Sequence, residues 1–412
     1  MNDLLKLLPD MKSGNDLFTA LSELPDYDDS IRNRSQAERL IALSDLYKFY
    51  IPSPMTIEIY SKIYLALLRS LQKKTTRTTV LQQNENYRGL QRESYSGIIG
   101  GSDSFTIIGT SGIGKSSAID RSIGLLSANG IIETENPYRR IIPCVVVQCP
   151  FDSSVKGLLL EILRKVDESI GSDYYNKSLK TRVTTDMLIG SVSQVAINHI
   201  GLLVVDEIQN VVSSKNGRNL VGMLTQLINN SGISICMVGT PECSIFFEQA
   251  LQLARRSLGL QYSALPYNEF FSKVCKILFS YQYTREKTEI SDVIIEWLYE
   301  HSGGIIAVVV SLIHDAQEIA ILGGKELLCL ETLNMAYKQR LALLHEYIEP
   351  TIKQGKQTAT NKNAKYELDI LGNDTVEDIA VSVAQIVSDA KRKNKDIITL
   401  LKKHFPVEEV RV

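Results

Sequence analysis

The sequence predicts an α/β protein in which helices flank a parallel sheet, followed by a small helical lid and a short helical C-terminal tail. Apolar runs rich in β-branched residues indicate four buried strands, at 105–108, 139–150, 202–205 and 233–242. Stretches with apolar residues at helical spacing separate these strands, as in sheets whose parallel strands are joined by helices. After about residue 285 the pattern is helical only.

A phosphate-binding loop follows the first predicted strand. Residues 105–117 read FTIIGTSGIGKSS, which fits G-x-x-x-x-G-K-[ST] without substitution. In such a loop the backbone N–H groups and the start of the next helix bind phosphate, Lys115 reaches the β- and γ-phosphates, and Ser116 holds Mg²⁺ through its hydroxyl. The alternative is a glycine-rich turn that matches by chance. The nucleotide-binding residues predicted are Gly109, Thr110, Ser111, Gly112, Ile113, Gly114, Lys115, Ser116 and Ser117.

A pair of carboxylates follows the third predicted strand, in GLLVVDEIQNV at 201–211. Asp206 is predicted to bind Mg²⁺, and Glu207 to orient the attacking water as general base. By itself the pair is also typical of a strand-to-loop cap. About 90 residues after a phosphate-binding loop, however, the two motifs support each other, and together they predict a Mg²⁺-dependent ATP hydrolase.

Three further candidate residues for the hydrolytic site lie at the end of the fourth predicted strand and after it. Thr240, in GTPE at 239–242, lies where a polar side chain could contact the γ-phosphate or the attacking water. An ordinary Gly-Thr-Pro turn is the alternative. Arg255 and Arg256 are candidates for a residue that neutralises the γ-phosphate of a neighbouring subunit. A solvated helix end would explain the pair equally well.

Composition and charge limit the classes of partner. The chain has 412 residues and a formal net charge of −2, so DNA binding would depend on a few local cations. Lys156 in the first turn of a helix, and Lys180 and Arg182 among hydroxyl residues before the next helix, are candidates for phosphate contacts, although solvated cations are the simpler reading of Lys156. Six cysteines lack any pairing or metal-binding spacing, and no signal peptide or membrane span is evident, so a cytoplasmic protein is predicted.

The same patterns predict five parts of the chain. Residues 1–34 form a polar N-terminal arm, and 35–96 a helical segment and linker. Residues 97–284 form the α/β core, and 285–350 the helical lid. The last part, 351–412, combines a basic flexible linker with a helical tail that is too short to fold without a partner.

Together, the stretches IIGTSGIGKSS, LLVVDEIQN, MVGTPE and LARRS resemble the AAA+ ATPases of Tn7-like transposons, of the TnsC/TniB type. The resemblance covers roughly residues 35–350. It implies an ATP-dependent protein that assembles with itself as a ring or helical filament on double-stranded DNA. Such a protein links a target-selection protein to transposase subunits, for which the C-terminal tail is the candidate docking segment. The resemblance also implies DNA contacts at Lys156, Lys180, Thr181 and Arg182.

The chain departs from many AAA+ proteins at the lid, where SGGIIAVVV contains no arginine to act as a second sensor. Two other classes share the phosphate-binding loop. A replication initiator or helicase loader would carry a DNA-reading module, and a nucleotide-switch signalling NTPase would carry long repeats or an effector domain. Neither addition is evident in the sequence.

Overall fold

The structure is a computed structural model that describes residues 7–74, 104–128, 130–135, 138–180, 183–243 and 258–341. All of these residues belong to one compact unit, Met1–Thr351. The predicted linker and tail at 351–412 lie outside the described residues, as does most of the predicted linker that precedes the first strand.

A six-stranded sheet forms the centre of this unit, in the order β2-β3-β4-β5-β1-β6. The pairs among β3, β4, β5, β1 and β6 are all parallel, whereas β2 pairs antiparallel with β3 at one edge. The predicted α/β fold with a mainly parallel sheet is therefore confirmed. The strands span Phe105–Gly109 (β1), Ile132–Glu135 (β2), Tyr138–Gln148 (β3), Ile200–Asp206 (β4), Ser234–Gly239 (β5) and Leu258–Tyr262 (β6).

The two edge strands were missed by the sequence pattern. β2 reads IETE and β6 reads LGLQY, so neither has the apolar run that marks the central strands. An edge strand is paired on one side only and does not require that pattern.

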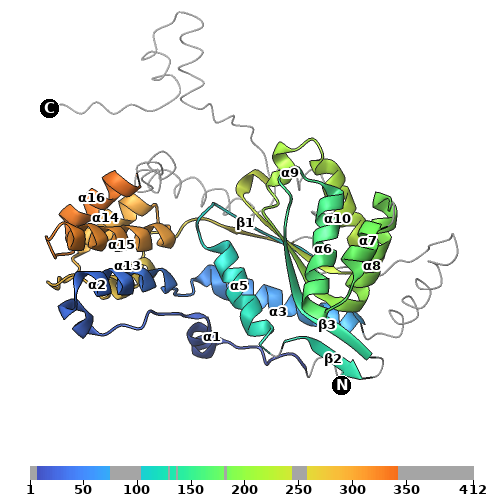
Figure 1. Cartoon of the computed structure of the whole chain (residues 1–412), viewed down its shortest axis with the longest axis horizontal. Coiled ribbons are helices and arrows are strands. Elements are labelled where there is room, and N and C mark those ends of the chain that lie inside the picture. Colours follow the sequence, from blue (N-terminus) through green and yellow to red (C-terminus); the bar gives the residue numbers. More distant parts are fainter. Residues whose placement is uncertain are drawn as a thin grey trace, which may run out of the picture. The chain divides into compact units, whose positions relative to one another are not determined.

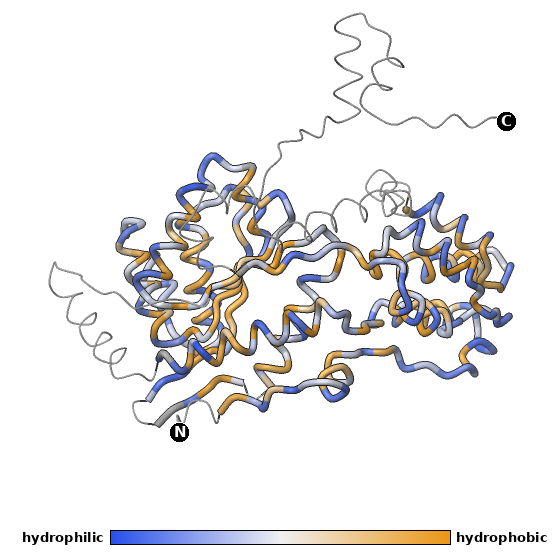
Figure 2. Tube along the Cα trace, turned by 180° about the vertical axis from the view of Figure 1, so that it is seen from behind, coloured by the Kyte–Doolittle hydropathy of each residue, from blue (hydrophilic) through white to orange (hydrophobic). Residues whose placement is uncertain are grey.

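Helices cover both faces of the sheet (Figure 1). One apolar cluster joins the sheet to α6 (Val155–Ile170), α8 (Thr185–His199) and α10 (Gly217–Ser231). A second cluster joins the opposite face to α1 (Gly14–Leu21), α3 (Pro54–Lys74) and α5 (Lys115–Leu126). Figure 2 shows that the hydrophobic residues concentrate along the strands between these layers. Burial on both faces explains why the central strands are almost continuously apolar.

The C-terminal end of α3 is anchored by hydrogen bonds to the start of β4 and to the end of α8. Ser70 Oγ donates to the carbonyl of Gly201 at 2.6 Å. Lys74 Nζ, which is buried, donates to the carbonyls of Ala196 and Ile197 at the end of α8, and burial lowers its pKa to about 7. These contacts hold α3 against the sheet just before the chain returns to it as β1.

A helical region follows the sheet and packs with part of the N-terminal segment. It contains α13 (Glu269–Phe279), α14 (Asp292–Ser302), α15 (Ile306–Leu322) and α16 (Leu330–Arg340), so the boundary predicted at 285 falls after its first helix. The buried Arg39 of α2 (Gln36–Leu43) pairs with Glu326 at 2.6 Å and donates to the carbonyl of Tyr283 at 2.9 Å. Helix α2 and the helices that follow the sheet thus pack into one helical region, although Arg39 and Glu326 are 287 positions apart in the chain.

Among the described helices, none is long and apolar enough by itself to span a membrane. Only the pair α14 and α15, bent by 117°, passes a test of length and composition when the two helices are taken together.

Candidate functional site

The predicted phosphate-binding loop connects β1 to α5 at the carboxyl edge of the sheet. β1 lies between β5 and β6 and is buried along its whole length. Gly112 and Gly114 have φ angles of +80° and +92°, which residues with a β-carbon rarely adopt. The backbone path of the loop at these two positions therefore favours glycine, as expected of a phosphate-binding loop.

Lys115 lies inside the loop. Its Nζ donates to the carbonyl oxygens of Gly109 and Thr110 at 2.6 and 2.9 Å, and the side chain is buried. Burial lowers the pKa of Lys115, while the carboxylates of Asp206 and Glu207 oppose this shift. The ammonium is thus held at the loop by dipoles and negative charges that a bound phosphate would supplement.

The fold brings the two predicted magnesium ligands into direct contact. Ser116 Oγ donates to Asp206 Oδ2 at 2.9 Å, although the residues are 90 positions apart. Asp206 is the last residue of β4, and Ser116 is in the first turn of α5. A hydroxyl and a carboxylate oxygen are ligands that Mg²⁺ prefers, so the donor set fits this cation.

Glu207 lies directly beyond the end of β4 in an unusual backbone conformation. Its φ of +57° is rare for a residue other than glycine, and its N–H donates to Asp206 Oδ1 at 2.8 Å. The Glu207 carboxylate is exposed and accepts a hydrogen bond from Gln209 Nε2. Backbone strain of this kind is common at functional sites, where the surrounding structure holds a side chain in a particular direction.

Thr240 follows β5, the strand between those that end in the phosphate-binding loop and in Asp206. Its side chain hydrogen-bonds to the carboxylate of Glu242, and this bond lowers the pKa of that carboxyl, with a smaller contribution from the charge of Lys115. Glu242 was not among the residues predicted from the sequence. Its position directly after Gly-Thr-Pro at 239–241 could have indicated a third acidic residue at the site.

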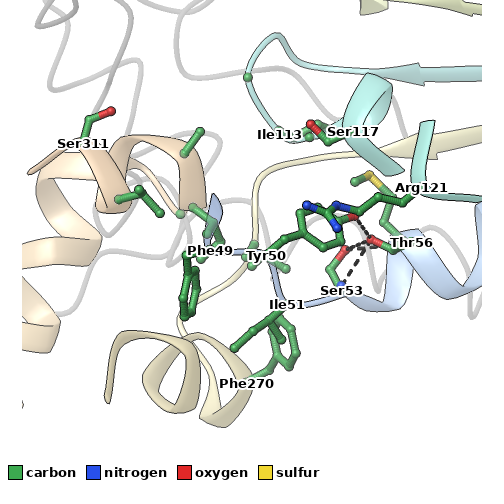
Figure 3. A pocket seen from close by; sticks show the side chains of 18 of the residues that line it. Phe49, Tyr50, Ile51, Ser53, Thr56, Ile113, Ser117, Arg121, Phe270 and Ser311 are labelled. Carbon is green, nitrogen blue, oxygen red and sulfur yellow. Dashed lines mark hydrogen bonds between the residues drawn. The ribbon is translucent and has the colours of Figure 1, made fainter. Parts of the chain in front are cut away.

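A pocket of about 320 Å³ opens beside the loop, and no sequence motif predicted it. Three separate parts of the chain line it (Figure 3). The segment Tyr47–Thr56 contributes aromatic and hydroxyl side chains, the loop and α5 contribute Gly112 to Arg121, and the helical region contributes residues from Ser263 to Ser311. Among the described lining residues no side chain is acidic, and Arg121 carries the only charge.

Arg121 connects the pocket to the N-terminal arm. Its guanidinium lies 4.1 Å from the centre of the Tyr50 ring and pairs with Glu23 at 2.7 Å. Glu23 and Tyr50 also exchange two backbone hydrogen bonds, of 2.9 and 2.7 Å. The Tyr50 hydroxyl in turn contacts Thr56 Oγ1 at 2.9 Å, as the dashed lines in Figure 3 show. The arm is therefore bound to two residues that line the pocket, Tyr50 and Arg121.

The predicted DNA-contacting residues have different outcomes. Lys156 is exposed in the first turn of α6, as expected. Lys180 precedes the start of α8, as predicted, but the short helix α7 (Tyr174–Lys180), of which Lys180 is the last residue, was not predicted. The Asp167 carboxylate accepts from the backbone N–H groups of Tyr174 and Tyr175 at 3.0 and 2.7 Å, which stabilises this short helix. Thr181, Arg182, Arg255 and Arg256 lie outside the described residues.

Comparison with known families identifies the central part of the chain. Residues 101–262 match the family model described as bacterial TniB protein. This segment belongs to the TniB family. The TniB segment contains the phosphate-binding loop, the Asp206–Glu207 pair and Thr240, which are the motifs on which the predicted resemblance was based. The resemblance to the AAA+ ATPases of Tn7-like transposons, predicted for roughly residues 35–350, is therefore confirmed over residues 101–262.

No curated protein matches the sequence. Among solved structures, the chain is similar to the ORC1 protein of Aeropyrum pernix in complex with DNA, with 14% identity and a TM-score of 0.40 over 79% of this chain and 82% of that chain. It is also similar to the ADP form of the ORC2 protein of Aeropyrum pernix, with 16% identity and a TM-score of 0.39 over 64% of this chain and 67% of that chain.

Proposed function

We propose that this chain is an ATP-hydrolysing regulator of transposition that oligomerises on target DNA and links a target-selection protein to the transposase. The observation that carries the proposal is the 2.9 Å hydrogen bond between Ser116 and Asp206, next to the buried Lys115. The bond unites a phosphate-binding loop and a carboxylate pair at one edge of the sheet, in a segment of the TniB family.

Each residue at this edge has a separate role in the hydrolysis of ATP. Lys115 and the backbone of the loop bind the β- and γ-phosphates. Ser116 and Asp206 would hold Mg²⁺, which when bound supplies positive charge against the phosphate oxygens. Glu207 orients the attacking water and accepts its proton, and Thr240 holds the water or the γ-phosphate oxygens in line. Arg255 or Arg256 of a neighbouring subunit would complete the charge balance.

The pocket beside the loop would take the base and ribose of the nucleotide. Its volume of about 320 Å³ lies within the range of small-molecule sites, and it opens directly onto Gly112 and Gly114 of the loop. Aromatic and aliphatic side chains such as Phe49, Ile113 and Val310 supply apolar walls, and the hydroxyls of Ser53 and Thr56 supply polar contacts. A nucleotide would thereby connect the sheet to the helical region.

DNA binding would run through a few cations, because the net charge of the chain is −2. Lys156, Lys180 and Arg182, with the hydroxyl of Thr181, are the proposed contacts, and all of them suit phosphate rather than base edges. We therefore expect ATP-dependent binding that barely distinguishes sequences and weakens with salt.

Duplex binding and assembly test the proposal directly. The full-length chain is titrated with two unrelated duplexes, with and without a non-hydrolysable ATP analogue, and the complexes are imaged by electron microscopy. The expected result is a ring or helical filament on both duplexes that requires the analogue. A sharp preference for one sequence would favour an initiator instead. Absence of DNA binding under all conditions would favour a nucleotide-switch NTPase.

The proposed link to the transposase uses the tail at 351–412. Deleting it should leave ATP-dependent DNA binding intact and abolish stimulation of transposition in a reconstituted reaction. Loss of ATP hydrolysis on deletion would contradict this role, because it would make the tail part of the ATPase core.

A further inference from the structure

A second hollow, of about 700 Å³, opens at the N-terminal turns of α6, α8 and α10. Helix α6 contributes Ser154 and Lys156, α8 contributes Thr185 and Asp186, and the start of α10 contributes Asn216, Arg218 and Asn219. Hydroxyl, amide and cationic side chains thus predominate on this surface.

Two of the lining residues are exposed cations that come from different segments. Neither Lys156 nor Arg218 forms an ion pair within the part of the chain that the structure describes, and Lys215, also exposed, lies in the turn before α10. Asp186 is the only carboxylate among the described lining residues. Positive charge is therefore in excess here on a chain whose net charge is −2.

An exposed aromatic residue borders the same surface. Phe151 is 86% exposed, more than any other large hydrophobic residue in the described ranges. The turn that carries it is tied to the start of α10, because the carbonyl of Asp152 accepts from Ser214 Oγ at 2.8 Å and from Asn216 Nδ2 at 3.4 Å. Ser153, which is buried with a φ of +53°, donates through Oγ to the carbonyl of Asn210 at 3.1 Å. A rigid turn therefore presents Phe151 to its surroundings.

The same turn is connected to the hydrolytic site. Cys149 donates its N–H to the carbonyl of Asp206 at 2.8 Å, and its own carbonyl accepts from Asn210 Nδ2 at 2.8 Å. Asn210 is three residues after Glu207 along the chain. These hydrogen bonds connect the end of β4 to Cys149, two residues before Phe151, so a change there on ATP binding would reach the turn that carries Phe151.

We propose that Arg218 and Phe151 form, together with Lys156, one contact surface for duplex DNA. This inference rests on the proposed function, which makes DNA the ligand, and it adds two contact residues from segments that the sequence analysis did not select. Arg218 binds the phosphate backbone, for which a guanidinium is well suited. Phe151 contacts the apolar edge of the sugars or the minor groove. A protein partner would require an exposed apolar centre, whereas of the apolar side chains that line the hollow Val155 is half-buried and Ile189 and Met223 are buried.

The test compares Arg218→Ala and Phe151→Ala in the full-length chain, with a non-hydrolysable ATP analogue and two unrelated duplexes, by fluorescence anisotropy across a range of salt concentrations. Arg218→Ala should lower the affinity by about tenfold at low salt and reduce the log–log salt slope by about 0.9 per lost contact. Phe151→Ala should lower the affinity by roughly threefold to tenfold without changing the slope. Arg218→Lys should recover the slope.

Controls separate this inference from the proposed function. Arg285→Ala removes an exposed arginine of the helical region and should bind as the parent does. Binding of the ATP analogue by each variant verifies the fold. If the parent chain binds no DNA, the proposed function fails. If the parent binds and both Arg218→Ala and Phe151→Ala match it, only this inference fails. A Phe151→Ala variant that changes self-assembly without DNA, and leaves DNA affinity unchanged, would make Phe151 a subunit contact and overturn its assignment.

Discussion

The two ends of the candidate nucleotide site are built in different ways. At the phosphate end, the loop at 109–117 supplies the predicted phosphate contacts from one continuous stretch, and the ends of β4 and β5 add Asp206, Glu207 and Thr240. At the base end, the pocket takes its walls from Tyr47–Thr56, from α5 and from the helices after the sheet. The phosphate end is local, whereas the base end exists only where three parts of the fold meet.

This difference reflects what each end must recognise. Phosphate oxygens require N–H donors and a cation at defined positions, which a short loop before a helix provides by itself. A base and a ribose require an apolar slot with a few polar groups, and many side chains can form one. We therefore expect substitutions at the phosphate end to affect hydrolysis, and substitutions at the base end to affect ATP affinity alone.

The largest effect is expected from Lys115→Ala. Loss of the ammonium at the β- and γ-phosphates should weaken ATP binding by about 100-fold or more and abolish hydrolysis. Isothermal titration with ATP measures the binding, and Lys276→Ala, which removes an exposed lysine of α13, is the control. Retention of parental affinity would mean that the base end dominates binding.

Glu207→Gln should separate binding from chemistry at the phosphate end. The amide keeps the size of the side chain and cannot accept the proton of the attacking water, so turnover should fall by about 100-fold to 10,000-fold while ATP affinity is retained. Steady-state phosphate release and nucleotide titration measure the two quantities. Glu242→Gln makes the same change at a neighbouring acid. We expect a smaller loss of turnover from it, because Glu242 contacts Thr240 but is not proposed to accept the proton of the attacking water. Normal hydrolysis by Glu207→Gln would remove Glu207 from the site.

Ala307→Phe should act on the base end alone. Ala307 is exposed and lines the pocket, so a phenyl ring can enter the space without crowding the buried core. The affinity for ATP should fall by about tenfold to 100-fold, while competition by inorganic tripolyphosphate should be unchanged. Val293→Phe, at an exposed position of α14 outside the pocket lining, is the control. Equal losses for ATP and tripolyphosphate would show that the ends do not act separately.

Glu23→Gln should have the smallest effect. It removes the ion pair with Arg121, whose side chain is 28% exposed against 48% for Glu23, while Arg121 keeps its stacking on Tyr50. A partly exposed pair contributes at most about 1 kcal/mol, so ATP affinity should change by less than about fivefold, and less still at high salt. Arg121→Ala, which loses both contacts, should weaken binding further. A larger loss from Glu23→Gln than from Arg121→Ala would contradict this order.

The sequence predicted the central fold and the phosphate end because both follow from local patterns. Continuous apolar runs mark the buried strands, and the spacing of Gly109, Gly114 and Lys115 marks the loop. The φ of +92° at Gly114 favours glycine there, and a β-carbon at Gly109 would come within 2.9 Å of the carbonyl oxygen of Tyr262. The edge strands β2 and β6 escaped prediction, since strands paired on one side lack a full apolar signal. The seven-residue helix α7 was not predicted; its start is stabilised by Asp167 of the preceding helix, which accepts from the N–H groups of Tyr174 and Tyr175.

By itself the sequence predicted which side chains bind phosphate and which family residues 101–262 match, since both depend on short stretches with restricted geometry. The tertiary structure alone decided where the pocket beside the loop opens, how Arg39 and Glu326 join the N-terminal segment to the helical region, and that Arg218 and Lys156 line one hollow. Each of these features depends on residues far apart in the chain. Their proximity is set by the packing of helices on the sheet. Because many different apolar sequences can form the same packing, no short motif predicts which residues will meet.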